Sequence, residues 1–175
     1  MTPEFSKILD TDKLLQKAHP LTFGANEAER AAVAKRLNLQ SLDTLEATIT
    51  VTPPTAIQKQ TRLDVLLKAA FTQSCVVSLK PVPETLAEEF SLWLNKGPEP
   101  EESLSEDDYL DLANEEAETI YLNGETSLEM GEVLVQYLSL ALNPYPRHPN
   151  EAFDPSKHGD APENPFDALK GLEKK

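Results

Sequence analysis

The sequence contains one cysteine, few aromatic residues and no long hydrophobic run. Cys75 is the only cysteine among 175 residues, which excludes an internal disulfide and a zinc site built from several thiolates. Aromatic residues make up 6% of the chain, so a core drawn from its 39% hydrophobic residues must be mostly aliphatic. No run approaches the roughly 18 apolar residues of a membrane span. We therefore expect no membrane partner.

Groups that commonly carry catalysis are also scarce. The six glycines are dispersed, so no glycine-rich phosphate loop is present. His19, His148 and His158 each precede proline or glycine, and turns or tails hold a general base poorly. His148 and His158 with Asp154 and Asp160 match no recognised ligand spacing. The sequence predicts no catalytic residue, metal, cofactor or small-molecule substrate, and hence no enzyme.

The negative charge is concentrated in one part of the chain. The formal net charge is −14, but residues 95–133 hold 13 Asp or Glu and only one Lys. Residues 1–80 hold 10 Lys or Arg against 8 Asp or Glu. Because phosphate binding needs cations on one face, this division leaves nucleic-acid contact open. The first seven residues have neither a secretory nor a transit pattern, and the default location is the cytoplasm.

Alternating hydrophobic residues predict several strands. A short edge strand is expected near residues 5–9, followed by a helical turn at Leu14. Asn26 is a plausible N-cap for a helix to about Leu37. Period-2 alternation then predicts a strand at residues 45–52, a long one at 63–79, a return strand at 86–94 and a last one at 119–122. Asn123 and Gly124 predict a tight turn after it.

A strong helix is predicted after that turn. Thr126 and Glu129 fit a capping box, and nearly every later position to Leu142 is apolar except one narrow polar stripe. Such a helix should lie buried across the apolar face of the sheet.

The predicted fold class is α+β: an antiparallel sheet, open or partly closed, covered by a long buried C-terminal helix. Residues 1–143 are expected to form one domain, with an acidic loop at residues 95–118. Residues 144–175 are expected to form an extended, proline-rich tail that ends in a short helix at residues 165–173.

Two residues of the long strand stand out. Cys75 could be a metal ligand, a nucleophile or a small core residue; its parity with Phe71, Val77 and Leu79 favours the core. Gln73 is the one polar side chain on that parity. It indicates a bend or bulge in preference to an exposed recognition point.

Four segments in this order resemble the YceD family of large ribosomal RNA subunit accumulation proteins. They are Gln73-Ser-Cys75-Val-Val-Ser78-Leu79-Lys-Pro81-Val82, Ile120-Tyr-Leu-Asn-Gly124-Glu, Leu138-Ser-Leu-Ala-Leu142-Asn-Pro144-Tyr-Pro146-Arg147 and Asn164-Pro165-Phe166. The resemblance runs from about Phe5 to the C-terminus, and the acidic loop is its least matched part. Many members have Cys-x-x-Cys where this chain has Cys75 and Ser78. One thiolate cannot form a tetrahedral thiolate site, so the resemblance implies a metal-free variant.

The resemblance also implies a function. The expected role is non-catalytic support of large-subunit (23S) ribosomal RNA accumulation or processing, through binding of RNA or a ribosomal protein. Candidate RNA contacts are Lys68, Gln73, Arg147 and Lys170, with Gln73 reading a base edge. The alternative is an adaptor whose acidic segment engages a basic partner without RNA contact, with a helix bearing Phe166, Leu169 and Leu172 docking in a groove.

Overall fold

The computed structural model describes residues 4–14, 20–56, 60–99 and 118–150. The predicted acidic loop, the end of the predicted tail and its helix fall mainly outside these ranges. The described elements are β1 (Ile8–Asp10), α1 (Thr11–Leu14), β2 (Leu21–Gly24), α2 (Glu27–Arg36), β3 (Ser41–Thr52), β4 (Thr61–Ser74), β5 (Pro81–Asn95), β6 (Glu118–Tyr121), β7 (Ser127–Glu129) and α4 (Met130–Ala141).

The larger sheet has five strands in the order β2-β3-β4-β5-β6. The first three pairings are antiparallel, while β6 runs parallel to residues Leu92–Asn95 of β5. β1 and β7 form a separate antiparallel pair. The α+β class is thus confirmed. The sheet is not closed, because its edge strands β2 and β6 pair with β3 and β5 and not with each other.

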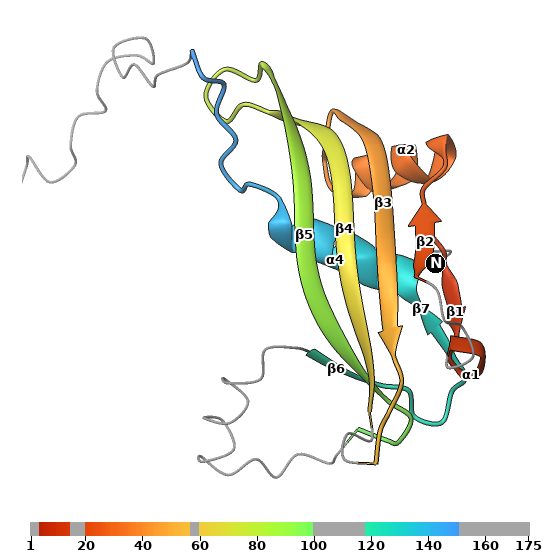
Figure 1. The fold of residues 1–175 in the computed structure, drawn as a ribbon. Helices are drawn as coiled ribbons and strands as arrows, with labels where there is room; N and C mark the ends of the chain where they lie inside the picture. Colours follow the sequence, from red (N-terminus) through yellow and green to blue (C-terminus); the bar gives the residue numbers. More distant parts are fainter. Residues whose placement is uncertain (1–3, 15–19, 57–59, 100–117, 151–175) are drawn as a thin grey trace, which may run out of the picture.

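Alternation along β3, β4 and β5 gives the sheet one apolar face. Leu45, Ala47 and Ile49 of β3 are buried, and so are Leu63 to Phe71 at every second position of β4. α4 crosses the sheet on this side (Figure 1). We call the face of the sheet under α4 the inner face and the opposite face the outer face. The periodicity of the sequence predicted these three strands and most of their inner residues. The strand predicted at residues 63–79 ends at Ser74, however, and Leu79, which shared its apolar parity, is 75% exposed in the turn that follows.

β4 differs from the prediction around Gln73. The strand keeps one register with β5 from Thr61 to Ser74, and Gln73 pairs with Val82 without any irregularity. A bulge at Gln73 is therefore wrong, and β4 ends one residue later, at Ser74. The irregularity of the sheet lies instead in β3, where the register with β4 shifts between Leu42 and Thr44.

α4 also differs from the prediction. Residues Ser127–Glu129 form β7, so the helix begins only at Met130, and Glu129 makes no side-chain cap hydrogen bond. The predicted capping box is wrong because pairing with β1 extends the backbone there. The helix has 12 residues and buries one face only. Leu140 is 81% exposed, which contradicts the prediction of a long buried helix.

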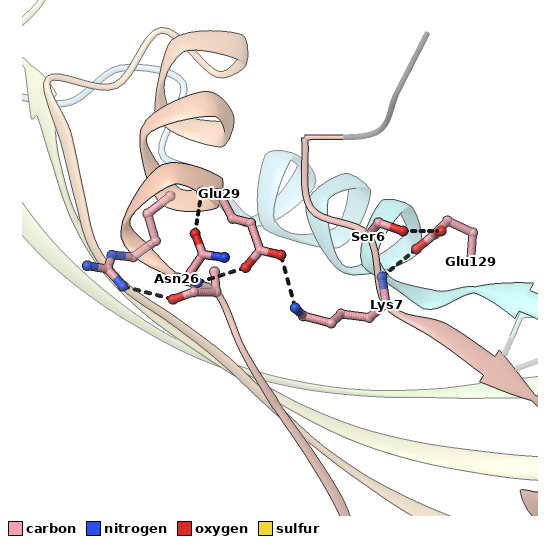
Figure 2. Close-up of polar contacts among 7 residues, drawn as sticks. Ser6, Lys7, Asn26, Glu29 and Glu129 are labelled. Atoms are coloured by element: carbon pink, nitrogen blue, oxygen red, sulfur yellow. Dashed lines mark hydrogen bonds and ion pairs between the residues drawn. The ribbon is translucent and has the colours of Figure 1, made fainter.

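The capping box that does form belongs to α2. The Asn26 side chain accepts a hydrogen bond from the Glu29 amide (3.0 Å), and Glu29 accepts one from the Asn26 amide (2.7 Å). These bonds, with that of Lys7 Nζ to Glu29 Oε1 (3.0 Å), appear in Figure 2. The hydrogen bond from the Asn26 backbone, with Lys7 adding to it, lowers the pKa of Glu29 although burial opposes this. The predicted N-cap is confirmed.

The N-terminal segment is fixed against the start of α4. Glu129 accepts hydrogen bonds from the Lys7 amide (2.6 Å) and the Ser6 hydroxyl (2.8 Å) (Figure 2). The Met130 amide donates to the Lys7 carbonyl (2.9 Å). Lys7 thus links α2 to α4 through two glutamates. None of the described helices has the length and hydrophobicity needed to cross a bilayer.

Candidate functional site

The end of β4 meets the segment that follows α4, and we call residues 73–80 with residues 143–148 the corner. The Val76 amide donates to the Pro146 carbonyl (2.9 Å), and the Gln73 side-chain amide donates to the Asn143 carbonyl (3.1 Å). Within the turn, the Cys75 amide donates to the Lys80 carbonyl (2.9 Å). The beginning of the predicted tail therefore lies against the body of the protein.

Cys75 lies at the centre of the corner. Its side chain is 0% exposed, which confirms the predicted core position. The His148 amide donates to its sulfur (3.3 Å). This bond, followed by donors of Ser78 and Val77, outweighs burial and lowers the pKa of the Cys75 thiol to about 7. Sequence reasoning missed the His148 donor because it is 73 residues away.

The described groups that lower the pKa of this thiol are the His148 amide, the Ser78 side chain and the Val77 and Ser78 amides, which act as hydrogen-bond donors. The His148 Nδ1 atom accepts a hydrogen bond from the Asn150 amide (3.4 Å). Among the described residues, no group of three or more His, Cys, Asp or Glu side chains could hold a metal ion. The arrangement stabilises a turn and can ionise a buried thiol, but a nucleophile must also reach a substrate.

The candidate RNA contacts within the described residues lie in two places, Lys68 on the outer face of β4 and Gln73 and Arg147 in the corner. Lys68 is exposed on the outer face of β4, in register with Glu46 of β3 and Ala87 of β5. Gln73 has the opposite parity on the same strand, and its Oε1 is buried with no hydrogen-bond partner. Arg147 is exposed in the corner. Lys170 and the docking residues Phe166, Leu169 and Leu172 lie outside the described residues.

Many described cations are held by carboxylates. Of the ten described Lys and Arg residues, at least five form ion pairs: Lys7 with Glu29, Lys13 with Asp10, Arg36 with Glu4 and Glu132, Arg62 with Asp64, and Lys96 with Asp12. The Arg36 guanidinium binds Glu132 through two bonds of 2.8 and 2.6 Å. Within the described residues, these pairs reduce the number of cations that could bind phosphate.

A polar network that sequence reasoning missed lies in a shallow hollow of the outer face. Arg62 Nε donates to Asp64 Oδ1 (2.7 Å), and Ser91 Oγ donates to the same oxygen (2.7 Å). Burial raises the pKa of Asp64, but these two donors lower it further than burial raises it. The Arg62 guanidinium also lies 5.6 Å from the Trp93 ring centre. One feature of the sequence could have indicated this network. Arg62 and Asp64 alternate with the apolar residues of β4, and Ser91 and Trp93 with those of β5, so all four are expected on the outer face.

Comparison with known proteins gives one result. No curated protein and no solved structure matches the chain. The family model described as "Large ribosomal RNA subunit accumulation protein YceD" matches residues 63–173, from within β4 almost to the C-terminus. The match covers more than half of the chain and includes the corner, α4 and all of the outer network except Arg62. The chain therefore belongs to the YceD family, as its motifs predicted.

Proposed function

We propose that this protein supports the accumulation or processing of large-subunit ribosomal RNA as a non-catalytic binding factor in the cytoplasm. We further propose that its direct partner is a basic protein, such as a ribosomal protein, and not the RNA. The family description supplies the link to large-subunit ribosomal RNA. The nature of the partner is argued from charge.

The pairing of cations with carboxylates carries this proposal. At least half of the described Lys and Arg residues are in ion pairs, and the whole chain carries a net charge of −14. RNA binding depends on free cations that replace the counterions of phosphate. A basic protein gains from the same acidic surface through faster association and charge complementarity. The negative net charge and the pairing of the cations therefore favour a protein partner over RNA.

The non-catalytic part of the proposal rests on the geometry around Cys75. Its sulfur is fully buried and receives backbone donors, while catalysis by a thiolate requires access to substrate. Cys75→Ser should therefore restore large-subunit RNA levels in cells that lack the protein. A variant that folds normally but fails to restore them would contradict this part.

The partner is tested by isolating the tagged protein from cells with and without nuclease treatment. Retention of a basic large-subunit protein after nuclease supports the proposal. Loss of every partner, together with crosslinks to large-subunit RNA, would establish direct RNA contact instead. In that case Lys68→Ala and Arg147→Ala, at the two exposed candidate cations, should weaken the RNA contact.

A further inference from the structure

One edge of the large sheet has unpaired backbone. β5 spans Pro81–Asn95, and β6 pairs only with its residues Leu92–Asn95. In the described part of the chain, no strand pairs with residues 81–91 on that side, as Figure 1 also shows. At the usual rise per residue this edge is about 35 Å long. A strand edge of this length is a template for another strand.

The residues that offer backbone groups to this edge can be identified. The Asn95 carbonyl accepts a hydrogen bond from the Leu122 amide, just after β6, so Asn95 faces the edge. The Lys80 carbonyl accepts from the Cys75 amide, so Lys80 faces the β4 side. Because this orientation alternates along a strand, odd-numbered residues face the edge. Thr85, Ala87 and Glu89 each present an amide and a carbonyl, and all three are exposed.

The side chains along this edge are acidic. Glu88 and Glu89 are exposed, and Glu84 is partly exposed. Lys68 is the cation nearest in register, opposite Ala87. A second copy of this edge would bring the glutamates of both copies together, and like charges across strands are unfavourable. RNA is anionic and cannot continue a peptide hydrogen-bond ladder. The acidic side chains and the edge-facing backbone groups of β5 together fit a partner strand with cationic side chains.

We propose that residues 84–91 of β5 bind an extended, Lys/Arg-rich protein segment by strand addition. The backbone of Thr85, Ala87 and Glu89 supplies the ladder, and Glu84, Glu88 and Glu89 receive the cations. β6 already occupies the next residues of the same edge, so the bound segment extends the sheet in line with it. This inference rests on the proposed function where it assigns the segment to a large-subunit protein.

The test uses the full chain and a blocked nine-residue peptide of alternating lysine and valine, with binding measured by fluorescence anisotropy. Its control is the same peptide N-methylated at each central residue, which keeps the charge but removes backbone donors. Strand addition predicts that the methylated peptide binds at least about tenfold more weakly. Equal binding of the two peptides would mean attraction by charge alone and would overturn the proposal.

Two protein variants locate the contact. Ala87→Pro removes an edge-facing amide and leaves the β4 pairing in place, so it should weaken binding about tenfold. The double variant Glu88→Lys, Glu89→Lys should weaken peptide binding by a similar factor and leaves the backbone unchanged. It therefore tests the proposal even if Ala87→Pro fails to fold. The matched control is Asp43→Lys, an exposed charge reversal on β3, which should leave binding unchanged.

Amide chemical shifts give an independent readout. The peptide should shift the amide signals of Thr85, Ala87 and Glu89 more than those of Arg62 and Asp64 in the outer hollow. Shifts centred elsewhere, or no binding by the unmethylated peptide, would overturn strand addition at this edge. None of these measurements involves ribosomal RNA, so their failure leaves the proposed function standing. Unchanged large-subunit RNA in cells lacking the protein would overturn the proposed function alone.

Discussion

The Cα of Gly131 faces the carbonyl group of Phe5 so closely that a Cβ atom at Gly131 would lie 1.9 Å from the Phe5 oxygen. Both residues are buried at the place where the N-terminal segment crosses the first turn of α4. Since the obstacle is backbone, a side chain at residue 131 can be accommodated only if the segment moves. Gly131 lies within the residues that the family model matches, whereas Phe5 lies far outside them.

Gly131→Ala should therefore destabilise the protein by about 2 kcal/mol, although alanine is the better helix former by about 1 kcal/mol. The measurement is urea unfolding followed by circular dichroism. Gly24→Ala is the control, because no atom lies within 4 Å of a Cβ at that position. A Gly131→Ala protein as stable as the wild type would refute the close approach.

Phe90 and Tyr137 join β5 to α4. Their rings stack with centres 3.6 Å apart and planes 4° apart, and the Tyr137 hydroxyl donates to Glu118 (3.0 Å). A double-mutant cycle with Phe90→Leu and Tyr137→Leu should give a coupling free energy of about 1 kcal/mol. Tyr137→Phe keeps the stack and should keep the coupling. Additive effects of the two leucine substitutions would show that the rings do not interact.

Cys75 predicts a pH dependence of stability. The folded-state pKa of its thiol, about 7, lies below the ordinary value near 8.5. Between these two values the unfolded chain binds more protons, so stability rises with pH. The contribution is complete above the unfolded pKa and is lost as the pH falls through about 7.

Denaturant unfolding in reductant at several pH values from 6 to 9 tests this. The stability of the wild type minus that of Cys75→Ala should increase across this range, because other titrating groups cancel in the difference. A constant difference would mean that the His148 amide and its neighbours do not stabilise the thiolate.

Asn26 should contribute to stability as the cap of α2. Asn26→Ala removes the acceptor of the Glu29 amide and should cost about 1 kcal/mol. Asn26→Asp keeps an acceptor and is expected to stay close to the wild type in thermal unfolding. If both variants lost the same stability, the contribution of Asn26 would not come from its side-chain cap.

Local patterns were sufficient for much of the fold. Hydrophobic alternation gave the inner faces of β3, β4 and β5, since side-chain direction in a strand follows parity. Asn26 and Glu29 predicted their own cap because both partners lie within one turn. The family motifs likewise depend on residues within short segments, and the match over residues 63–173 confirmed them.

Long-range contacts determined what local patterns could not. Thr126 and Glu129 have the spacing of a capping box, but pairing with β1 makes Ser127–Glu129 a strand, and Glu129 binds Lys7 and Ser6 instead. Gln73 looked like a bend, yet its amide reaches Asn143, 70 residues away.

The sequence by itself thus determined the strands, the first cap and the family, because these depend on neighbours along the chain. Only the tertiary structure decided the lowered pKa of Cys75, the pairing of the cations and the edge of β5 with which no described strand pairs. The donor to Cys75, the cation pairs between distant segments and the strand order each depend on which remote part of the chain lies beside a residue, and no periodicity records that.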